Sequence, residues 1–537
     1  MKKERCDVLV IGGGGAGLRA ALAAREAGAD TILASKARVG YGNNTYISKA
    51  TIASTGFGPA EDGPAVHEQD TLEGGRFLND PALVRKMTQG IPGEMRYLVS
   101  SGVAFQEKGE GLKVMFTPGH AHPRHVFVPR RVGGDLMLPL LERARKAGVR
   151  LCDRVFVSRV SISRDGVQGA MGFDEQGFFW TFQAASVVLA TGGYAQVYRN
   201  NNNAPRLTGD GHALALEAGV SLRDMEFVQF YPTALGRHGK RLLLYEAIVF
   251  RGGAVLRNAH EEDILERHGL KDPKAATRDR LAQAVTREIL EGRDVEGGLI
   301  MDLGDLAEDM PPSIRPLLPG TWTRDQKRLI VSPTTHFCMG GVITGPDAAT
   351  SLPGLFAAGE VSGGLHGANR LGGNALAEVF VMGAEAGRNA ARHAKDAGEP
   401  ALREEEIAAE KKRLEGLGTE GGPDTASLTL DLKNLMWRHA GILRDEAGLA
   451  NALDILEDMA QASRQASVQG PRDLRALLEL QNMVQVSRMV CRSALLRTES
   501  RGAHFRSDYP AEDDINWRTY IVVSLKSGKV DFSVAPG

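Results

Sequence analysis

The sequence predicts an α/β fold: a Rossmann-like nucleotide-binding domain, interrupted by an inserted α+β domain and followed by a helical domain. Three observations predict this fold class. Residues 6–11 are strand formers that lead directly into a glycine-rich turn and an Ala- and Leu-rich segment. Residues 185–193 and 354–360 repeat the pattern of a buried strand that ends at glycines. Beyond about residue 401 the chain is charged, with apolar residues at helical spacing.

Composition limits the possible classes of protein. The 537 residues are too many for one simple core and suggest ~3 domains. The formal net charge of -1 gives no indication of a nucleic-acid partner or of binding to an anionic membrane surface. No apolar run approaches the ~18 residues of a membrane span, and the first strand starts too early for a signal peptide. We therefore expect a cytoplasmic protein without a direct membrane span.

The cysteines predict neither a disulfide framework nor a metal centre. They are scattered along the chain and form no Cys-x-x-Cys pair: Cys6, Cys152, Cys338 and Cys491. Iron–sulfur clusters need cysteine ligands at closer spacing than this. An iron–sulfur cluster, if the activity needs one, would therefore have to belong to another chain.

The glycine-rich turn carries the first candidate site. Its glycines follow the GxGxxG pattern and stand between a strand and a helix, as a dinucleotide-binding turn requires. Gly12 permits the tight turn, Gly14 lets the backbone approach a pyrophosphate, and Gly17 lets the helix pack close to the strand. The helix N-terminus offers free N–H groups and a partial positive charge to the phosphates. The candidate cofactor contacts in this turn are Gly12, Gly14, Ala16 and Gly17.

The second strand, residues 31–34, ends at Ser35 and Lys36. A typical dinucleotide-binding fold has Asp or Glu at this point to bind the ribose, and Ser35 is the expected substitute. Residues 40–55, which include Asn44 and Thr45, are small and polar. They are suited to lie along a ligand; the alternative is an ordinary surface loop. Ser35, Lys36, Asn44 and Thr45 are therefore candidate cofactor contacts.

Three histidines follow Phe116 closely: His120, His122 and His125. Their spacing suggests a metal site. Two prolines and a glycine make the segment a loop, however, and no nearby carboxylate or thiolate completes a set of ligands. We expect a polar loop near the substrate or cofactor, and no metal.

Further elements follow in order. Residues 133–148 are expected to form a helix and residues 151–157 a strand. The strand that ends at residue 189 leads into Ala190, Thr191 and Gly192, a turn that commonly closes over the cofactor. Asp210 lies near the start of a helix that runs to residue 218. Asp210 is either a cofactor contact or a capping residue, because a carboxylate suits the positive end of the helix dipole.

Changes in character divide the chain into four segments. Residues 1–235 form the first part of the nucleotide-binding domain, and residues 346–400 its second part, with a helix at 374–393. Residues 236–345 are richer in charge, include a helical stretch at 277–291 and lack a βαβ rhythm. They are interpreted as an inserted domain. Residues 401–537 form a helical domain and tail, suited to packing or to docking a partner.

Ordered motifs over essentially the whole chain resemble the flavoprotein subunits of succinate dehydrogenase and fumarate reductase, a family that includes L-aspartate oxidase. The motifs span residues 12–17, 190–193, 208–211, 229–233, 276–279, 333–341, 366–374 and 497–504. The resemblance implies FAD in the nucleotide-binding domain and a mobile capping domain, here 236–345, over the substrate. It also implies a small carboxylate substrate and electron exchange with an iron–sulfur partner subunit. Such partners could hold the chain at a membrane.

The resemblance implies roles for individual residues. Arg278 falls where the family has the arginine that delivers a proton to the substrate. Because the free pKa of arginine is above ~12, this role needs a relay to a carboxylate such as Glu246; the alternative is a plain electrostatic clamp. His336 and Arg370 fall where the family binds a substrate carboxylate, which an arginine can hold with two parallel hydrogen bonds. The remaining candidate cofactor contacts are Glu360, Asn374, Ala375 and Leu376.

Two departures from the family affect the chemistry. Members with covalent flavin have His before Thr where this chain has Asn44. Asparagine cannot form that bond, so FAD should be noncovalent, with a lower potential that favours alkene reduction. Tyr231 replaces the histidine of the family's QFHPT motif, and Tyr245 replaces a threonine. Both affect the part of the site that receives one substrate carboxylate. We therefore expect a monocarboxylate or a dicarboxylate derivative rather than fumarate.

The sequence thus favours an FAD-dependent oxidoreductase that interconverts C=C and CH–CH next to a carboxylate. A second interpretation is an L-aspartate oxidase-like enzyme, against which Tyr231 counts. A third is a flavin electron-transfer subunit of a larger complex, similar to adenylylsulfate reductase, whose substrate pocket has degenerated.

Overall fold

The structure is a computed structural model. It describes residues 1–117, 119–236, 243–244, 248–249, 252–272, 276–308, 310, 315, 318 and 321–536. Two residues that the sequence analysis assigned to the substrate site, Tyr245 and Glu246, lie outside the described residues.

A seven-stranded sheet organises the first part of the chain. Its strand order is β8-β2-β1-β11-β10-β9, and β18 also pairs with β11. The pairs that join β8, β2, β1, β11 and β18 are parallel, whereas β10 pairs antiparallel with β11 and β9. The strands are β1 (Lys2–Ile11), β2 (Thr31–Ser35), β8 (Arg150–Asp153), β9 (Val155–Ser163), β10 (Gly166–Asp174), β11 (Phe179–Leu189) and β18 (Leu355–Ala357).

Four parallel strands end at the same level. Ile11 pairs with Ala34 of β2 and with Leu189 of β11, and Leu189 in turn pairs with Ala357 of β18. The turns that follow these strands therefore lie together at the carboxyl edge of the sheet, where ligands bind in open α/β sheets.

The strand expected at residues 151–157 is wrong as a single element. Arg154 has a left-handed backbone with φ of +60°, which a continuous strand cannot contain. The chain therefore divides there into β8, which pairs with β2, and β9, which pairs with β10.

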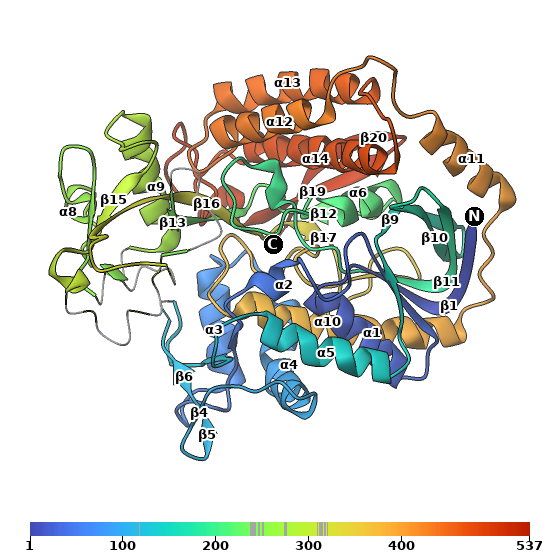
Figure 1. Cartoon of the computed structure of the whole chain (residues 1–537), viewed down its shortest axis with the longest axis horizontal. Coiled ribbons are helices and arrows are strands. Elements are labelled where there is room, and N and C mark those ends of the chain that lie inside the picture. The colour runs from blue at the N-terminus through green and yellow to red at the C-terminus, as the bar shows by residue number, and fades with distance from the viewer. Residues whose placement is uncertain are drawn as a thin grey trace.

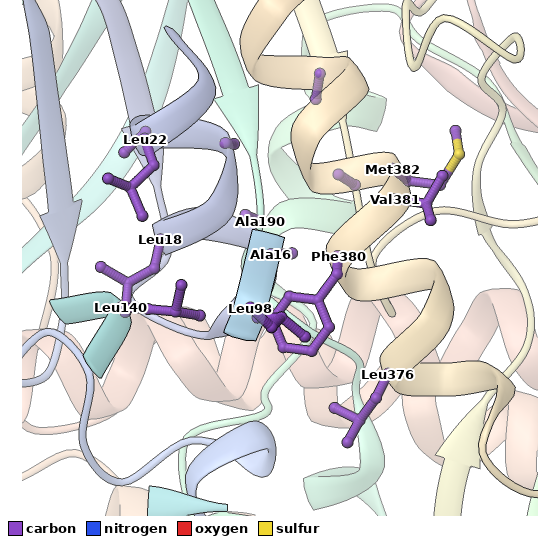
Figure 2. Close-up of a cluster of buried hydrophobic side chains, with 14 of the residues drawn as sticks. Ala16, Leu18, Leu22, Leu98, Leu140, Ala190, Leu376, Phe380, Val381 and Met382 are labelled. Carbon is purple, nitrogen blue, oxygen red and sulfur yellow. The ribbon is translucent and has the colours of Figure 1, made fainter. Parts of the chain in front are cut away.

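Helices and small strands cover this sheet. Long helices α1, α10, α5 and α4 share one buried apolar cluster, part of which Figure 2 shows between α1 and α10. Close packing of α10 on α1 depends on a glycine, since a Cβ on Gly387 would lie 2.1 Å from the Ala20 carbonyl oxygen. The helices are α1 (Gly15–Glu26), α2 (Asn44–Ile47), α3 (Pro64–Gly74), α4 (Pro81–Ser100), α5 (Gly134–Lys146), α6 (Asp210–Glu217) and α10 (Asn374–Asp396), with 3-10 turn η1 (Ala195–Val197). The small strands are β3 (Thr51–Ala53), β4 (Glu107–Lys108), β5 (Gly111–Leu112), β6 (Val114–Met115) and β7 (His125–Phe127).

An antiparallel sheet with its own apolar cluster lies at the left of Figure 1. Its order is β13-β16-β15-β14, and the helices α8 and α9 accompany it. The elements are β13 (Val228–Leu235), β14 (Val255–Arg257), α8 (Ile264–Arg267), α9 (Arg278–Leu290), β15 (Leu299–Asp302), η2 (Gly304–Ala307) and β16 (Arg328–Cys338). Residues 228–235 and 328–338 pair along this sheet, so β13 and β16 connect it to the rest of the chain.

The last part of the chain is a group of helices that Figure 1 shows at the top, followed by a hairpin. The elements are α11 (Glu404–Glu415), α12 (Thr425–His439), α13 (Glu446–Arg464), α14 (Pro471–Leu496), α15 (Asp514–Trp517), β19 (Thr519–Lys526) and β20 (Lys529–Pro536). β19 pairs with β12 (Leu222–Arg223), which also pairs with β17 (Gly341–Val342). The hairpin therefore joins the tail to the middle of the chain. No helix in the described part of the chain is long and apolar enough to cross a membrane.

Candidate functional site

The turn after β1 has no room for side chains at two of its glycines. Gly12 has φ of +123°, and a Cβ there would lie 2.1 Å from the Ala190 carbonyl oxygen. A Cβ on Gly17 would lie 1.8 Å from the Gly12 carbonyl oxygen. At Gly14, in contrast, φ is -85° and an added Cβ would lie 3.8 Å from the nearest atom. Protein packing therefore requires Gly12 and Gly17, whereas Gly14 leaves open the approach to the helix that a pyrophosphate needs.

Two helices begin near this edge at a glycine, which has no side chain to cap its own helix. The N-cap residues of α1 and α10 are Gly14 and Gly373, and neither helix has an acidic residue in its first turn. Their first N–H groups and positive dipole ends are therefore suited to anions or to carbonyl oxygens of a ligand. Thr45 lies at the first of these helices, where its Oγ1 accepts a hydrogen bond from the Gly15 N–H at 3.3 Å.

The α10 end carries three of the expected cofactor contacts. Asn374 is buried at the first position of the helix, next to Ala375. The Leu376 side chain points into the apolar cluster of Figure 2, as does Ala16 of α1. Leu376 and Ala16 therefore face the core with their side chains, and only their backbones are available to a ligand.

Lys36 joins three parts of the chain at the end of β2. Its Nζ lies 2.6 Å from Asp210 Oδ2, 2.8 Å from Glu479 Oε1 and 2.7 Å from Thr208 Oγ1. Burial opposes the charged form of Asp210, but the ion pair with Lys36 prevails and lowers the pKa of the Asp210 carboxyl. Asp210 also lies in the first turn of its own helix α6, where a carboxylate suits the positive end of the helix dipole.

The two neighbouring turns complete this side of the site. Ser35 is buried at the end of β2, and a Cβ on Gly13 would lie 2.9 Å from its Oγ. After β11, Ala190 donates its N–H to the Ile11 carbonyl, and Gly192 has φ of +76°. Between them the Thr191 Oγ1 is buried and has no hydrogen-bond partner in the protein. A buried hydroxyl without a partner is suited to a ligand group.

Asn44 lies on the far side of the glycine turn, beside Glu360. Its Nδ2 donates to Asn203 Oδ1 at 2.6 Å and to Glu360 Oε2 at 3.2 Å, and its Oδ1 accepts from the Ala204 N–H. Glu360 also accepts a hydrogen bond from the Cys338 N–H at 3.1 Å. Burial raises the pKa of the Glu360 carboxyl from 4.5 to about 7.

Tyr231 and Arg278 meet where the antiparallel sheet faces these turns. Tyr231 is fully buried on β13, paired with Thr334 of β16. Arg278 is the first residue of α9, and its guanidinium carbon lies 4.8 Å from the centre of the Tyr231 ring. A cation over the face of an aromatic ring at this distance is attracted to it.

His336 completes this group from β16. Its ring meets the Tyr231 ring at 5.6 Å with the planes at 68°, and its Nδ1 lies 3.2 Å from the Asn202 side-chain amide. Burial, together with Arg370 and Arg278, holds the pKa of His336 well below 6.5. The imidazole is therefore neutral and can donate one N–H.

Arg370 faces the same space from the loop before α10. Its Nη2 donates to Gln229 Oε1 at 2.8 Å, its Nη1 donates to the Leu371 carbonyl at 3.1 Å, and its buried Nε has no partner. The guanidinium carbon lies 4.8 Å from the centre of the Phe337 ring. Burial and the nearby Arg278 lower the pKa of Arg370 to about 9.

The three histidines that follow Phe116 differ in burial. His120 and His125 are buried, lie 4.9 Å apart between ring centres, and both contact the Gly372 carbonyl, whereas His122 is more exposed. His67 of α3 joins them, with its ring 5.8 Å from that of His120. Within the described residues, no group of three His, Cys, Asp or Glu side chains is arranged to hold a metal ion.

Sequence reasoning missed several residues of this site. Glu479 on α14, Asn202, Asn203 and His67 reach it from distant segments, and no local pattern marks them. Gln229 lies within one of the family motifs, but its function was not inferred: its Nε2 donates to the Arg370 carbonyl while its Oε1 accepts from the Arg370 side chain.

FAD fits this arrangement. The open approach at Gly14, the uncapped starts of α1 and α10, and the unpartnered Thr191 hydroxyl offer hydrogen-bond partners for a pyrophosphate and for polar groups of a dinucleotide. The cationic and neutral donors Arg278, His336 and Arg370 lie on the other side and are suited to a carboxylate.

Comparisons with known proteins agree with this arrangement. Residues 7–376 match the model of an FAD binding domain, and residues 429–536 match the fumarate reductase flavoprotein C-terminal domain. An uncharacterized FAD-dependent oxidoreductase of Methanocaldococcus jannaschii is 35% identical over 99% of both chains. A fumarate reductase (CoM/CoB) subunit of Methanothermobacter marburgensis is 35% identical over 97% of both chains.

A solved structure shows the same fold over the whole chain. Sdh1 of Mycobacterium smegmatis, in complex with UQ1, has a TM-score of 0.90 and 32% identity. The match covers 100% of this chain and 95% of that one. The α/β fold class, with its FAD-binding, capping and C-terminal helical parts, is confirmed.

Proposed function

The chain belongs to the flavoprotein-subunit family of fumarate reductase and succinate dehydrogenase and is an FAD-dependent oxidoreductase, and from this premise we propose its reaction. The reaction interconverts a C=C bond and a CH–CH bond next to a carboxylate. We propose reduction of the alkene as the favoured direction, with electrons supplied by an iron–sulfur partner subunit. FAD, when bound, supplies the two-electron chemistry at the carbon–carbon bond.

The observation that carries this proposal is the surplus of positive charge around Arg370. Its two hydrogen-bond acceptors, Gln229 Oε1 and the Leu371 carbonyl, are uncharged, and its Nε has no partner. Its pKa is lowered to about 9 by burial and by Arg278, whose repulsion outweighs the opposing effect of Glu360 and Glu378. A substrate carboxylate at Arg370 would relieve this repulsion and accept charge-assisted hydrogen bonds.

His336 supports the same assignment. As a neutral imidazole next to two guanidinium groups, it can donate a hydrogen bond to a carboxylate oxygen without adding a further buried charge. Held in this way, the carboxylate withdraws electrons from the adjacent C=C bond and fixes the substrate in one orientation.

Arg278 is proposed to deliver the proton to the other carbon of the double bond. An arginine needs a route to reload its proton, because its free pKa exceeds ~12. Glu246 is the proposed relay carboxylate, and it lies outside the described residues.

The substrate is proposed to carry one free carboxylate at the Arg370 end and an uncharged group at the other. Tyr231 stands where related succinate, fumarate and aspartate enzymes have histidine. Tyr231 is buried, and its ring face is occupied by Arg278. A phenol can accept or donate a hydrogen bond to an ester, amide or carbonyl oxygen but adds no positive charge.

FAD is proposed to be noncovalent. Asn44 occupies the position of the flavin-linking histidine, and both ends of its amide are already hydrogen-bonded within the protein. The flavin should therefore be released by denaturation, without a tether to the chain.

The experiment is a panel of enoates assayed with the purified FAD-loaded protein and a chemically reduced dye. Crotonate and monomethyl fumarate represent the proposed class, fumarate the dicarboxylate, and L-aspartate with peroxide detection the oxidase alternative. We expect turnover of the monocarboxylates to exceed that of fumarate, and Arg370→Lys to remove it. Fastest turnover on fumarate would refute the proposed substrate class, and peroxide from L-aspartate would refute the proposed reaction.

A further inference from the structure

His120 and His125 share one acceptor. The Nε2 atom of each ring lies 2.9 Å from the Gly372 carbonyl oxygen, and the two Nε2 atoms lie 3.3 Å from each other. Both side chains are only 4% exposed, one from the loop after Phe116 and the other from the start of β7. We refer to His120 and His125 as the histidine pair.

The surroundings fix the tautomer of each ring. His120 Nδ1 lies 3.4 Å from Arg124 Nη1, which can only donate, so Nδ1 carries a lone pair and the proton is on Nε2. His125 Nε2 faces the Gly372 carbonyl, which can only accept, so the proton of this ring is on Nε2 and Nδ1 accepts from the Thr117 hydroxyl at 2.5 Å. The two N–H groups thus occupy the two lone pairs of one oxygen.

The surroundings favour the neutral form of both rings. Burial and Arg124 lower the pKa of His120 to about 4, and burial and the neighbouring His120 lower the pKa of His125 well below 6.5. Arg278 acts in the same direction on both pKa values, whereas the hydrogen bond to the Gly372 carbonyl opposes the shift at both rings and Asp70 opposes it at His120. Arg124 is itself fully buried and is held by Asp62 at 2.7 Å and Asp70 at 2.8 Å.

Gly372 lies between two parts of the proposed site. Arg370 is two residues before it, and the uncapped start of α10 follows at Asn374. Gln229 holds the other side of this loop through the Arg370 carbonyl at 2.8 Å, and His67 Nε2 lies 2.8 Å from Asn374 Oδ1. The Gly372 carbonyl and the Gly373 N–H belong to one planar trans peptide, so they point in opposite directions. Fixing the carbonyl therefore also fixes the direction of the Gly373 N–H.

We propose that His120 and His125 are positioning residues that, as a pair of neutral N–H donors to the Gly372 carbonyl, fix the loop that aims Arg370 at the substrate carboxylate. This inference rests on the proposed function, because it concerns the same carboxylate site. It assigns to the histidine loop a role in substrate affinity rather than in metal binding or proton transfer.

The shared acceptor predicts a distinctive pattern in a double-mutant cycle. If either His120→Ala or His125→Ala is made alone, the carbonyl keeps one donor, and the dissociation constant of a carboxylate should rise by about 3-fold. With both changes the carbonyl loses both donors, and we expect a rise of about 100-fold, well above the product of the single effects. The conservative change His125→Gln places an amide N–H near the position of the Nε2–H. Its dissociation constant for a carboxylate should therefore be closer to that of the wild type than the dissociation constant of His125→Ala is.

The experiment measures binding of butyrate, an unreactive carboxylate, through the change in flavin absorbance of the FAD-loaded protein, alongside KM and kcat for crotonate. His122→Ala, on the same loop, is the matched control and should change nothing. KM should follow the dissociation constant while kcat falls less, with FAD retained. Multiplicative effects, or unchanged affinity in the double variant with FAD retained, would overturn the positioning role alone. A wild-type protein that binds no carboxylate would overturn the proposed function and this role with it.

Loss of folding in the double variant is controlled separately. His120→Gln/His125→Gln keeps polar side chains at both positions and is measured in the same assay. Near wild-type affinity in this variant supports the donor role, whereas a loss as large as that of the alanine pair contradicts it.

Discussion

The guanidinium carbon of Arg278 lies 4.8 Å from the centre of the Tyr231 ring, so an aromatic face supports the cation proposed to act on the substrate. Tyr231 contributes no charge of its own to this end of the site. The His336 ring lies 5.6 Å from the Tyr231 ring between ring centres, and Arg370 has a buried Nε without a partner. We therefore propose an asymmetric site, in which Arg370 receives a substrate carboxylate and the neutral Tyr231, beside Arg278, faces an uncharged group of the substrate.

Restoring a histidine at position 231 should change substrate preference. Tyr231→His replaces a neutral phenol with an imidazole that can carry a positive charge, so the ratio of kcat/KM for fumarate to that for crotonate should rise by about 10-fold, equivalent to one charge-assisted hydrogen bond of about 1.4 kcal/mol. Tyr231→Phe keeps the ring under Arg278 and is the matched control, with a ratio near that of the wild type. An unchanged ratio in the histidine variant would argue against this site model.

The glycines of the first turn should separate cofactor binding from folding. Gly14→Ala has space in the protein, because its Cβ would lie 3.8 Å from the nearest atom. It should leave the thermal midpoint of the FAD-free protein unchanged and weaken FAD binding by at least about 10-fold, since the backbone can no longer approach the pyrophosphate. In Gly17→Ala the Cβ would lie 1.8 Å from the Gly12 carbonyl oxygen. This variant should have both a lower thermal midpoint and weaker FAD binding. Unchanged FAD affinity in Gly14→Ala would show that the pyrophosphate lies elsewhere.

The ion pairs of Lys36 should contribute strongly to stability. Lys36→Met leaves the largely buried carboxylates of Asp210 and Glu479 without their cation, which should lower the free energy of unfolding by about 3–5 kcal/mol. Lys146→Met removes an exposed ion pair with Glu142 and should lower the free energy of unfolding by less than about 1 kcal/mol. Urea denaturation of both variants measures the difference, and equal costs would mean that the Lys36 cluster is not buried in solution.

The buried Glu360 should make stability depend on pH. Because burial raises its pKa from 4.5 to about 7, the folded protein keeps this proton over a range in which the unfolded chain has lost it. Its contribution to stability is therefore complete below pH 4.5 and is lost as the pH rises through about 7, by roughly 3 kcal/mol. Glu360→Gln should flatten this part of the pH profile in urea denaturation of the FAD-free protein. An identical profile in the variant would show that Glu360 ionises normally.

Local patterns were sufficient to predict much of the fold. The strand, glycines and helix around Gly12 are adjacent in the sequence, so their pattern predicts both the turn and the cofactor class. The same reasoning failed at Arg154, because a left-handed backbone at an arginine has no local signature and turns one expected strand into two. The sequence analysis likewise did not predict the C-terminal hairpin. Its strand β19 pairs with β12, which lies some three hundred residues earlier in the chain.

The candidate site was less predictable than the fold. Family motifs selected His336 and Arg370, but the partners that orient them come from other segments. Gln229 reaches Arg370 across the interface between β13 and the loop before α10. Glu479 reaches Lys36 from α14. Such contacts depend on tertiary packing, which no window of sequence contains.

The most direct test of the proposed reaction is anaerobic reoxidation of the reduced flavin by crotonate, followed through the flavin absorbance. We predict rapid reoxidation in the wild type, none with the saturated analogue butyrate, and a loss of at least about 100-fold in Arg370→Lys, because lysine cannot make the proposed bidentate contact with the carboxylate. Reduced flavin that stays reduced with crotonate, monomethyl fumarate and fumarate alike would contradict the proposed reaction.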